Sequence, residues 1–175
     1  YHLEAGALSI LLDCGPGAVH RMARFGVDWT GLTHILLSHF HTDHIGDLPG
    51  LFFAFRHASR ERTLPLTVLG PVGTRERLSR RASAFDGSIL DPGFPLEIRE
   101  LAGDESLDLD ADTRLHAIRT PHTENSIGYR IETPDASFGY TGDTGYPGAT
   151  GDLHEGAGTP SGPALGRFFR GVDIL

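Results

Sequence analysis

Lysine is absent from this sequence, and cysteine, methionine and tryptophan each occur once in its 175 residues. A single cysteine excludes an internal disulfide framework and argues against a structural zinc site, because such sites are typically rich in cysteine. No apolar run approaches the roughly 20 residues that a membrane-spanning helix needs, and no charged-then-apolar leader is present. We therefore expect a cytoplasmic protein that does not associate with membranes.

Positive charge is scarce as well. The chain carries 15 basic residues, all of them arginine, against 23 acidic residues, and its net charge is −8. A non-specific nucleic-acid binder is usually basic, because neutralisation of phosphates supplies most of its affinity. With 39% hydrophobic residues the chain is long enough to bury a real core, and we expect one domain over residues 1–175.

The densest cluster of metal-binding side chains lies in the stretch Ser38–His44, in the order His-x-His-x-Asp-His. Imidazole and carboxylate are the usual nitrogen and oxygen ligands of zinc and its neighbours. The apolar run His34–Leu37 before the cluster predicts a buried strand, and Gly46 and Pro49 follow it. The cluster is therefore predicted in a loop at a strand end, where catalytic groups usually lie. Its candidate metal ligands are His39, His41, Asp43 and His44.

Two further candidate ligands occur later in the chain, each after a predicted strand. His122 follows the extended stretch Leu115–Arg119, and Asp143 lies in a glycine-flanked turn after Tyr140. Glycine at such a turn lets backbone and metal approach closely. Six candidate ligands exceed the three or four protein ligands of one catalytic zinc. We therefore predict two metal ions bridged by one carboxylate.

The turn after the predicted strand Leu8–Leu12 contains another carboxylate, Asp13. A carboxylate at a strand end is able to orient a metal-bound histidine from behind, and turn chemistry alone is an equally good interpretation. The neighbouring Cys14 is interpreted as a small buried apolar residue and not as a ligand.

Strands and helices are mixed along the chain, and each predicted helix has one apolar stripe, such as Leu48, Leu51, Phe52 and Phe55. This pattern predicts an α/β protein with two layers of sheet covered by helices. Hairpin-like neighbours over residues 95–143 favour a partly antiparallel sheet over a simple doubly wound parallel fold. We expect an acidic turn over residues 104–112 and a last strand that begins at Val172.

Arginines cluster at two places, near the end of the helix that follows the metal motif and along the next helix. A phosphate-binding rim and two solvated helical faces are both compatible with these clusters, and the solvated faces are favoured. The residues are Arg56, His57, Arg60 and Arg62, then Arg75, Arg77, Arg80 and Arg81.

With these motifs the chain resembles the metallo-β-lactamase superfamily, and within it the ribonuclease Z-like and arylsulfatase-like branch. The first of the stretches that carry the resemblance is highly specific for the superfamily, whereas the others indicate the branch. They are Leu37–Leu51, then Pro121–Thr123 before Gly128–Ile131, and Tyr140–Thr144.

The resemblance implies a four-layer αββα sandwich. It also implies that His39, His41 and His122 hold one metal ion, that Asp43 and His44 hold the second, and that Asp143 bridges them. In this family a further histidine ligand and a His-Glu pair follow the strand that begins here at Val172, and a first strand precedes Tyr1. We therefore expect residues 1–175 to be an internal part of a longer enzyme, incomplete at both ends.

The implied function is that of a metal-dependent hydrolase, namely a phosphodiesterase or ribonuclease Z-like endoribonuclease. A hydroxide bridging two divalent ions attacks phosphorus in this reaction, and Asp43 is the expected catalytic residue that orients it. Zinc is the expected metal, although manganese and iron suit the same ligands. A phosphodiester such as RNA is the expected substrate, and a homodimer is expected because relatives often dimerise.

Two alternatives stay open. The same site would hydrolyse a carboxylic ester, thioester, lactone or β-lactam, since the ligands do not distinguish attack at carbonyl carbon from attack at phosphorus. The chain would otherwise be an inactive fragment that binds a metal or a partner. An electron-transfer role is disfavoured, because the diiron branch of the superfamily typically has Glu at the position of His41.

Overall fold

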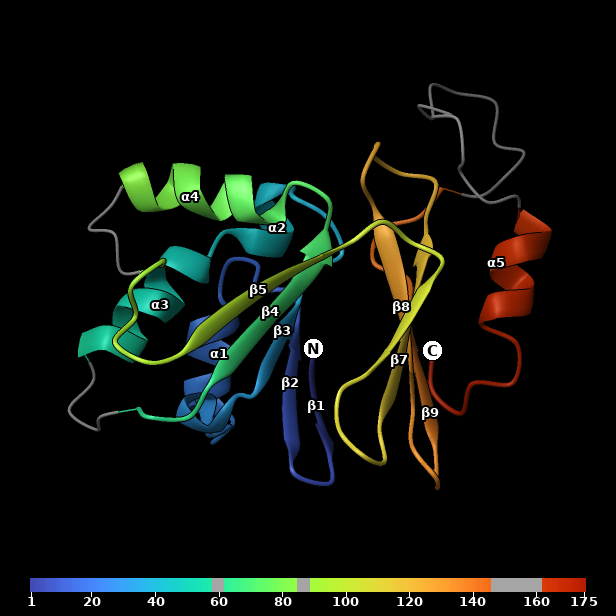
Figure 1. Cartoon of the computed structure of the whole chain (residues 1–175), viewed down its shortest axis with the longest axis horizontal. Helices are drawn as coiled ribbons and strands as arrows, with labels where there is room; N and C mark the ends of the chain where they lie inside the picture. Colours follow the sequence, from blue (N-terminus) through green and yellow to red (C-terminus); the bar gives the residue numbers. More distant parts are fainter. Residues whose placement is uncertain (58–61, 85–88, 146–161) are drawn as a thin grey trace. The chain divides into compact units, whose positions relative to one another are not determined.

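The computed structural model describes residues 1–57, 62–84, 89–145 and 162–175. The chain forms two compact units, Tyr1–Glu100 and Leu101–Leu175. One sheet belongs to the first unit and another to the second, as the labels in Figure 1 show. The expected single domain over residues 1–175 stays a prediction.

The sheet of the first unit has the strand order β1-β2-β3-β4-β5. β1 pairs with β2 in antiparallel orientation, whereas β2 with β3 and β3 with β4 are parallel pairs. In β2 the consecutive residues Ile10, Leu11 and Leu12 are all buried, so both faces of this strand are covered, as its continuous apolar sequence requires. The strands are β1 (His2–Ala5), β2 (Leu8–Leu12), β3 (His34–Leu36), β4 (Leu66–Pro71) and β5 (Leu96–Leu101).

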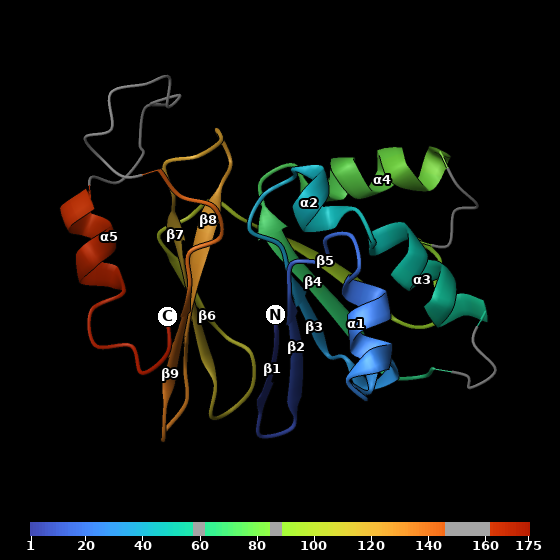
Figure 2. The same ribbon diagram turned by 180° about the vertical axis from the view of Figure 1, so that it is seen from behind.

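The helices of the first unit lie on one side of its sheet (Figures 1 and 2). The predicted apolar stripe of α3 is confirmed, because Leu48, Leu51, Phe52 and Phe55 are all buried. The helical segments are α1 (Ala18–Arg24), the 3-10 turn η1 (Trp29–Gly31), α2 (Thr42–Ile45), α3 (Leu48–His57) and α4 (Thr74–Ala84). None of the helices within the described residues is long and apolar enough to cross a membrane.

The buried residue Arg62 joins loop segments at one end of this sheet by hydrogen bonds to their carbonyls. Arg62 is 5% exposed and donates to the carbonyl oxygens of Thr30, Leu32 and Pro65. Its guanidinium lies 5.0 Å from the ring centroid of Phe55 and 4.7 Å from that of Phe94. Burial lowers the pKa of Arg62 to about 10, which leaves it charged at neutral pH. A cation in this position satisfies several loop carbonyls at once.

The sheet of the second unit is an antiparallel meander in the order β6-β7-β8-β9. The prediction of antiparallel neighbours in this part of the chain is therefore confirmed. The strands are β6 (Glu105–Asp108), β7 (Arg114–Arg119), β8 (Ile127–Glu132) and β9 (Ser137–Tyr140).

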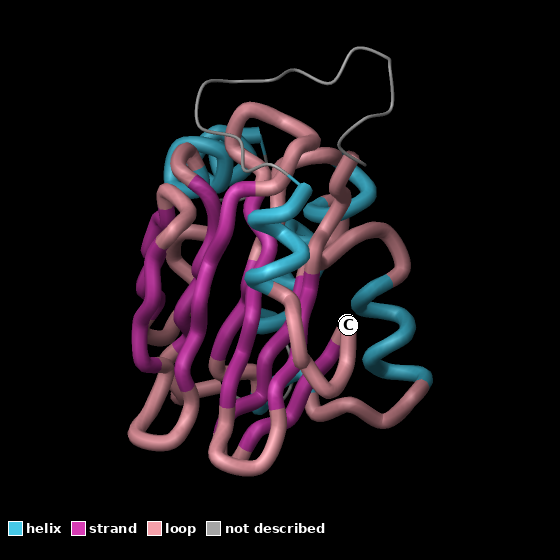
Figure 3. Tube along the Cα trace, turned by 90° about the vertical axis from the view of Figure 1, so that its right-hand side faces the viewer, coloured by secondary structure: helices cyan, strands magenta, loops and turns pink. Residues whose placement is uncertain are grey.

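The helix α5 (Gly162–Phe168) lies against one face of this second sheet (Figure 3). Two glycines of the sheet make room for the aromatic residue after the helix. A Cβ atom added at Gly128 would lie 3.1 Å from Phe169, and one added at Gly139 would lie 2.9 Å from it. The predicted strand after Val172 takes the form of a single parallel bridge between Phe138 and Ile174.

One strand was not predicted, and two local predictions are wrong. Residues His2–Ala5 form a strand that the sequence did not indicate, because pairing with β2 provides its hydrogen bonds. The expected acidic turn contains the strand β6, since Glu105–Asp108 pair with β7 despite their acidic composition. The metal motif, expected as a loop, includes the short helix α2. In β1 and β6 the pairing with a neighbouring strand overrides local propensity. The helix α2 is one turn, closed by hydrogen bonds from His44 and Ile45 to the carbonyl of His41.

Candidate metal centre

Asp13 ties the turn after β2 to the loop after β3. Its Oδ1 accepts a hydrogen bond of 2.7 Å from the backbone N–H of Ser38, and its Oδ2 accepts one of 2.7 Å from the Ser38 hydroxyl. The backbone N–H of Asp13 donates to Leu36 across the parallel pair. Asp13 is buried and has φ +56°, a left-handed conformation that Asp tolerates better than most residues.

The same carboxylate also orients the last histidine of the motif. Nδ1 of His44 lies 2.6 Å from Oδ2 of Asp13. A carboxylate only accepts, so Nδ1 of His44 carries the hydrogen and donates it. In the neutral ring this leaves the lone pair on Nε2, which is the form that binds a metal.

His39 is oriented by the hydroxyl of Ser38. The two side chains meet at 3.0 Å, between Oγ and Nδ1. The single hydrogen of this hydroxyl is used on Asp13, so Nδ1 of His39 is the donor and Ser38 accepts. His39 is fully buried and, in its neutral form, also presents Nε2 as the metal-binding nitrogen. Ser38 had no role in the sequence analysis, although its position directly before the first histidine was an available signal.

Close backbone packing holds this arrangement together. The backbone N–H of Cys14 donates to the carbonyl of His44 at 2.7 Å, and a Cβ atom added at Gly15 would lie only 1.7 Å from the carbonyl oxygen of Asp43. Cys14 is a buried member of the core, as predicted, and burial and then the charges of Asp47 and Asp13 raise the pKa of its thiol to about 12. A thiol that stays protonated at neutral pH is a poor metal ligand.

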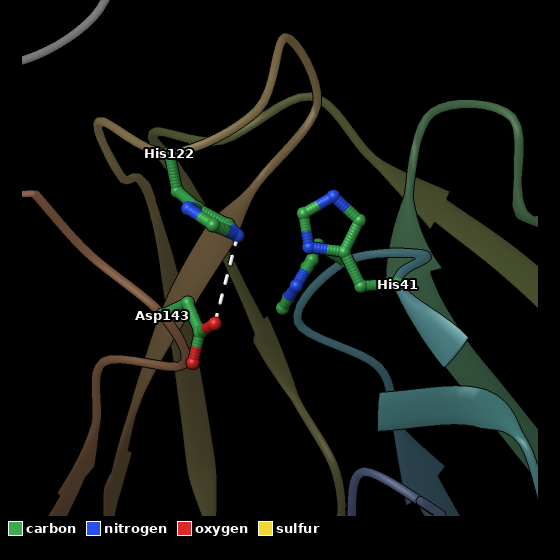
Figure 4. Close-up of side chains that lie close together, drawn as sticks. His41, His122 and Asp143 are labelled. Atoms are coloured by element: carbon green, nitrogen blue, oxygen red, sulfur yellow. Dashed lines mark ion pairs between the residues drawn. The ribbon is translucent and has the colours of Figure 1, made fainter. Parts of the chain in front are cut away.

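His41 and Asp43 are the exposed members of the motif. His41 lies at the N-terminal end of α2, as Figure 4 shows, and Asp43 lies in the first turn with 75% of its side chain exposed. Ligand atoms of His39 and His41 lie within 4.8 Å of each other, as do those of Asp43 and His44. The first unit therefore brings all four residues of the predicted cluster together.

The second unit brings together the two remaining candidate ligands (Figure 4). Nε2 of His122 lies 3.6 Å from Oδ2 of Asp143, whose side chain is 47% exposed. Their loops are joined by two hydrogen bonds, from Gly145 N–H to the carbonyl of Pro121 at 2.6 Å and from the Thr120 hydroxyl to the carbonyl of Asp143 at 3.3 Å. His122 lies shortly after β7 and Asp143 lies shortly after β9, as predicted.

The donors of both units suit a divalent ion of the zinc type. They comprise imidazoles and carboxylates without a thiolate, and two of the imidazoles are held in the metal-binding tautomer by Asp13 and Ser38. Hydrogen bonds of this kind are what a metal-binding histidine usually makes with its second nitrogen. The assignment of all six residues to one pair of ions, and the role of Asp13 behind them, stay predictions.

Comparison with known proteins agrees with the motif. Residues 9–159 match the family described as a β-lactamase superfamily domain. A ribonuclease Z from Mycobacterium sp. (strain KMS) is 35% identical over 171 residues, which cover 89% of this chain and 58% of that protein. The chain thus spans little more than half the length of this curated relative.

Solved structures agree on the fold. The metallo-β-lactamase fold protein YhfI from Bacillus subtilis superposes with a TM-score of 0.65 at 22% identity, over 85% of this chain and 55% of that one. The short form of human tRNase Z gives a TM-score of 0.66 at 22% identity, over 81% of this chain and 61% of that one. The predicted resemblance and fold class are therefore confirmed: the chain belongs to the β-lactamase superfamily and has the metallo-β-lactamase fold.

Proposed function

We propose that this chain is the metal-binding part of a phosphodiester hydrolase of the ribonuclease Z type, with RNA as its substrate. The observation that carries the proposal is the pair of Nδ1 hydrogen bonds that hold His39 and His44 as metal ligands. The 35% identity to a ribonuclease Z supports the choice of substrate. A cytoplasmic location and a homodimer stay predictions.

In this proposal His39, His41 and His122 hold one divalent ion, Asp43 and His44 hold the second, and Asp143 contacts both. When bound, the two ions activate water as a nucleophile near neutral pH and offset the charge of the phosphate. Zinc is the metal we propose, because imidazole and carboxylate ligands suit it, and manganese or iron would suit the same ligands.

The residues of the chain have separate tasks in this reaction. Asp43 is exposed, so its carboxylate is accessible to the attacking water, which it orients by accepting a hydrogen bond. Asp13 and Ser38 keep two imidazoles in the metal-binding form and are themselves buried from solvent. Their task is therefore positioning, whereas Asp43 contacts the reacting groups.

The first experiment is turnover of a bis-aryl phosphodiester by the full gene product that contains this chain, with zinc or manganese added. We expect Asp43→Ala to lower kcat by roughly a hundredfold or more, the usual contribution of a positioned acid or base. Asp108→Ala is the matched control, because Asp108 is an exposed carboxylate of the second unit that pairs with Arg114. Its turnover should equal that of the wild type.

Two other results would contradict the proposal. Hydrolysis of thioesters or lactones without hydrolysis of phosphodiesters would assign the site to carbonyl chemistry. No turnover of either class, together with fewer than two tightly bound ions per chain, would indicate an inactive binding protein.

A further inference from the structure

Two arginines of α4 lie one helical turn apart. Neither Arg77 nor Arg81 forms an ion pair with a carboxylate of the described residues. Their neighbours are engaged otherwise: Arg80 lies 2.5 Å from Glu76, and Arg75 donates to the carbonyl of Ile98 at 2.8 Å. Arg60 of the clusters noted in the sequence lies outside the described residues.

Arg77 lies directly beside the metal motif. Its guanidinium carbon is 5.4 Å from the centroid of the Phe40 ring, and Phe40 is the residue between His39 and His41. Phe40 is half-buried and packs against the core of the first unit, so it is a firm support. The helix that carries Arg77 lies next to α2 in both views of the ribbon (Figures 1 and 2).

A guanidinium that lies over an aromatic ring is attracted by the ring without using its N–H groups as hydrogen-bond donors to it. Hydrogen bonds to an anion form in the plane of the guanidinium. Arg77 is exposed, so its edge is accessible to a bound molecule. The planar fork of donors matches two oxygens of a phosphate.

Keeping these two cations together costs the protein free energy. Burial and then the positive charge of Arg77 lower the pKa of Arg81, so the two groups repel each other. Like charges four residues apart destabilise a helix. The chain has a net charge of −8, so carboxylates are abundant in it, yet none of the described ones pairs with these two arginines. An anion that bridges the two arginines would relieve it.

We propose that Arg77 and Arg81 bind successive phosphates of the RNA strand beside the scissile phosphate. The inference rests on the proposed function and adds to it a strand-binding surface on α4, in which Arg77 is held next to the metal ligands by Phe40. The occupant is a polynucleotide, because two adjacent cations suit a chain of phosphates better than the single phosphate of a small diester. The solvated helical face favoured by the sequence alone is the alternative that the test must exclude.

The test is equilibrium binding of a short fluorescein-labelled single-stranded RNA, read by anisotropy. All proteins carry Asp43→Ala in the full gene product with metal added, so that cleavage does not interfere. Arg77→Ala and Arg81→Ala are each expected to raise Kd roughly fivefold, and each should reduce the slope of log K against log salt by about 0.7. Arg80→Ala removes the same charge from the same helix and should leave both quantities unchanged. Circular dichroism verifies that every variant is folded.

The outcomes separate this inference from the proposed function. Equal Kd values for Arg77→Ala, Arg80→Ala and the parent would overturn the inference, and so would an equal loss in all three variants, which would reveal a diffuse charge effect. Cleavage of RNA and of a bis-aryl phosphodiester by the wild type is measured in parallel. Failure of that cleavage would refute the proposed function without altering the binding result. In the active background we expect Arg77→Ala to raise KM for RNA while kcat is retained.

Discussion

The carboxylate of Asp13 lies 2.6 Å from Nδ1 of His44, although 31 positions separate the two residues in the sequence. Asp13 ends one strand of a parallel pair and the metal motif follows the other, so their carboxyl ends place both groups at the same edge of the sheet. The contact selects one tautomer of His44 and fixes the orientation of its ring.

Asp13→Asn is expected to lower the affinity for metal roughly 10- to 100-fold, the usual effect of losing a partner behind a metal ligand. Asn tolerates the left-handed backbone of this position, so the substitution changes chemistry and not conformation. The affinity is measured by competition with a chromophoric chelator. Asp28→Asn, in the cap of η1, is the control and should bind metal like the wild type. An unchanged affinity in Asp13→Asn would remove Asp13 from the site.

Gly15→Ala is expected to destabilise the first unit by about 2 kcal/mol or more and to weaken metal binding. The new Cβ atom would overlap the carbonyl oxygen of Asp43, which lies in backbone and is unable to rotate away. Urea unfolding and the same chelator competition measure the two effects. Gly50→Ala is the matched control, because no atom lies within 4 Å of its added Cβ and Ala is the better helix former. A Gly15→Ala variant as stable as Gly50→Ala would contradict the close approach.

Arg62→Met is expected to lower the free energy of unfolding by about 3 kcal/mol, because the carbonyls of Leu32, in a buried hydrogen bond, and of Pro65, in a partly buried one, lose their charged donor. Methionine keeps the length and apolar body of the side chain, so the loss measures hydrogen bonds more than packing. The measurement is a urea denaturation curve. Arg80→Ala, which breaks an exposed pair with Glu76, should change stability by less than about 1 kcal/mol. A similar loss of unfolding free energy in the two variants would show that the hydrogen bonds of Arg62 do not stabilise the fold more than an exposed ion pair does.

Much of the local structure follows from sequence pattern. The apolar runs before Asp13 and before Ser38 are buried strands because consecutive apolar side chains point to both faces of the strand, so neither face is suited to solvent. The stripe of α3 is buried because its spacing matches one face of a helix. The acidic strand β6 was not predictable in this way, because it forms only by pairing with β7. The helix α2 is a single turn closed by hydrogen bonds from His44 and Ile45 to the carbonyl of His41, too short for a periodic pattern to reveal.

The sequence by itself determined the superfamily, the chemical type of the metal-binding side chains and the positions of the six candidate ligands. A dense set of imidazoles and carboxylates at strand ends has few other uses, and spacing along the chain is enough to reveal it. Only the tertiary structure decided the tautomers of His39 and His44, the part that Ser38 takes in them and the placement of Arg77 on Phe40. These features depend on contacts between residues that lie far apart in the sequence. Residue type does not determine which of them touch, because the register of the paired strands does.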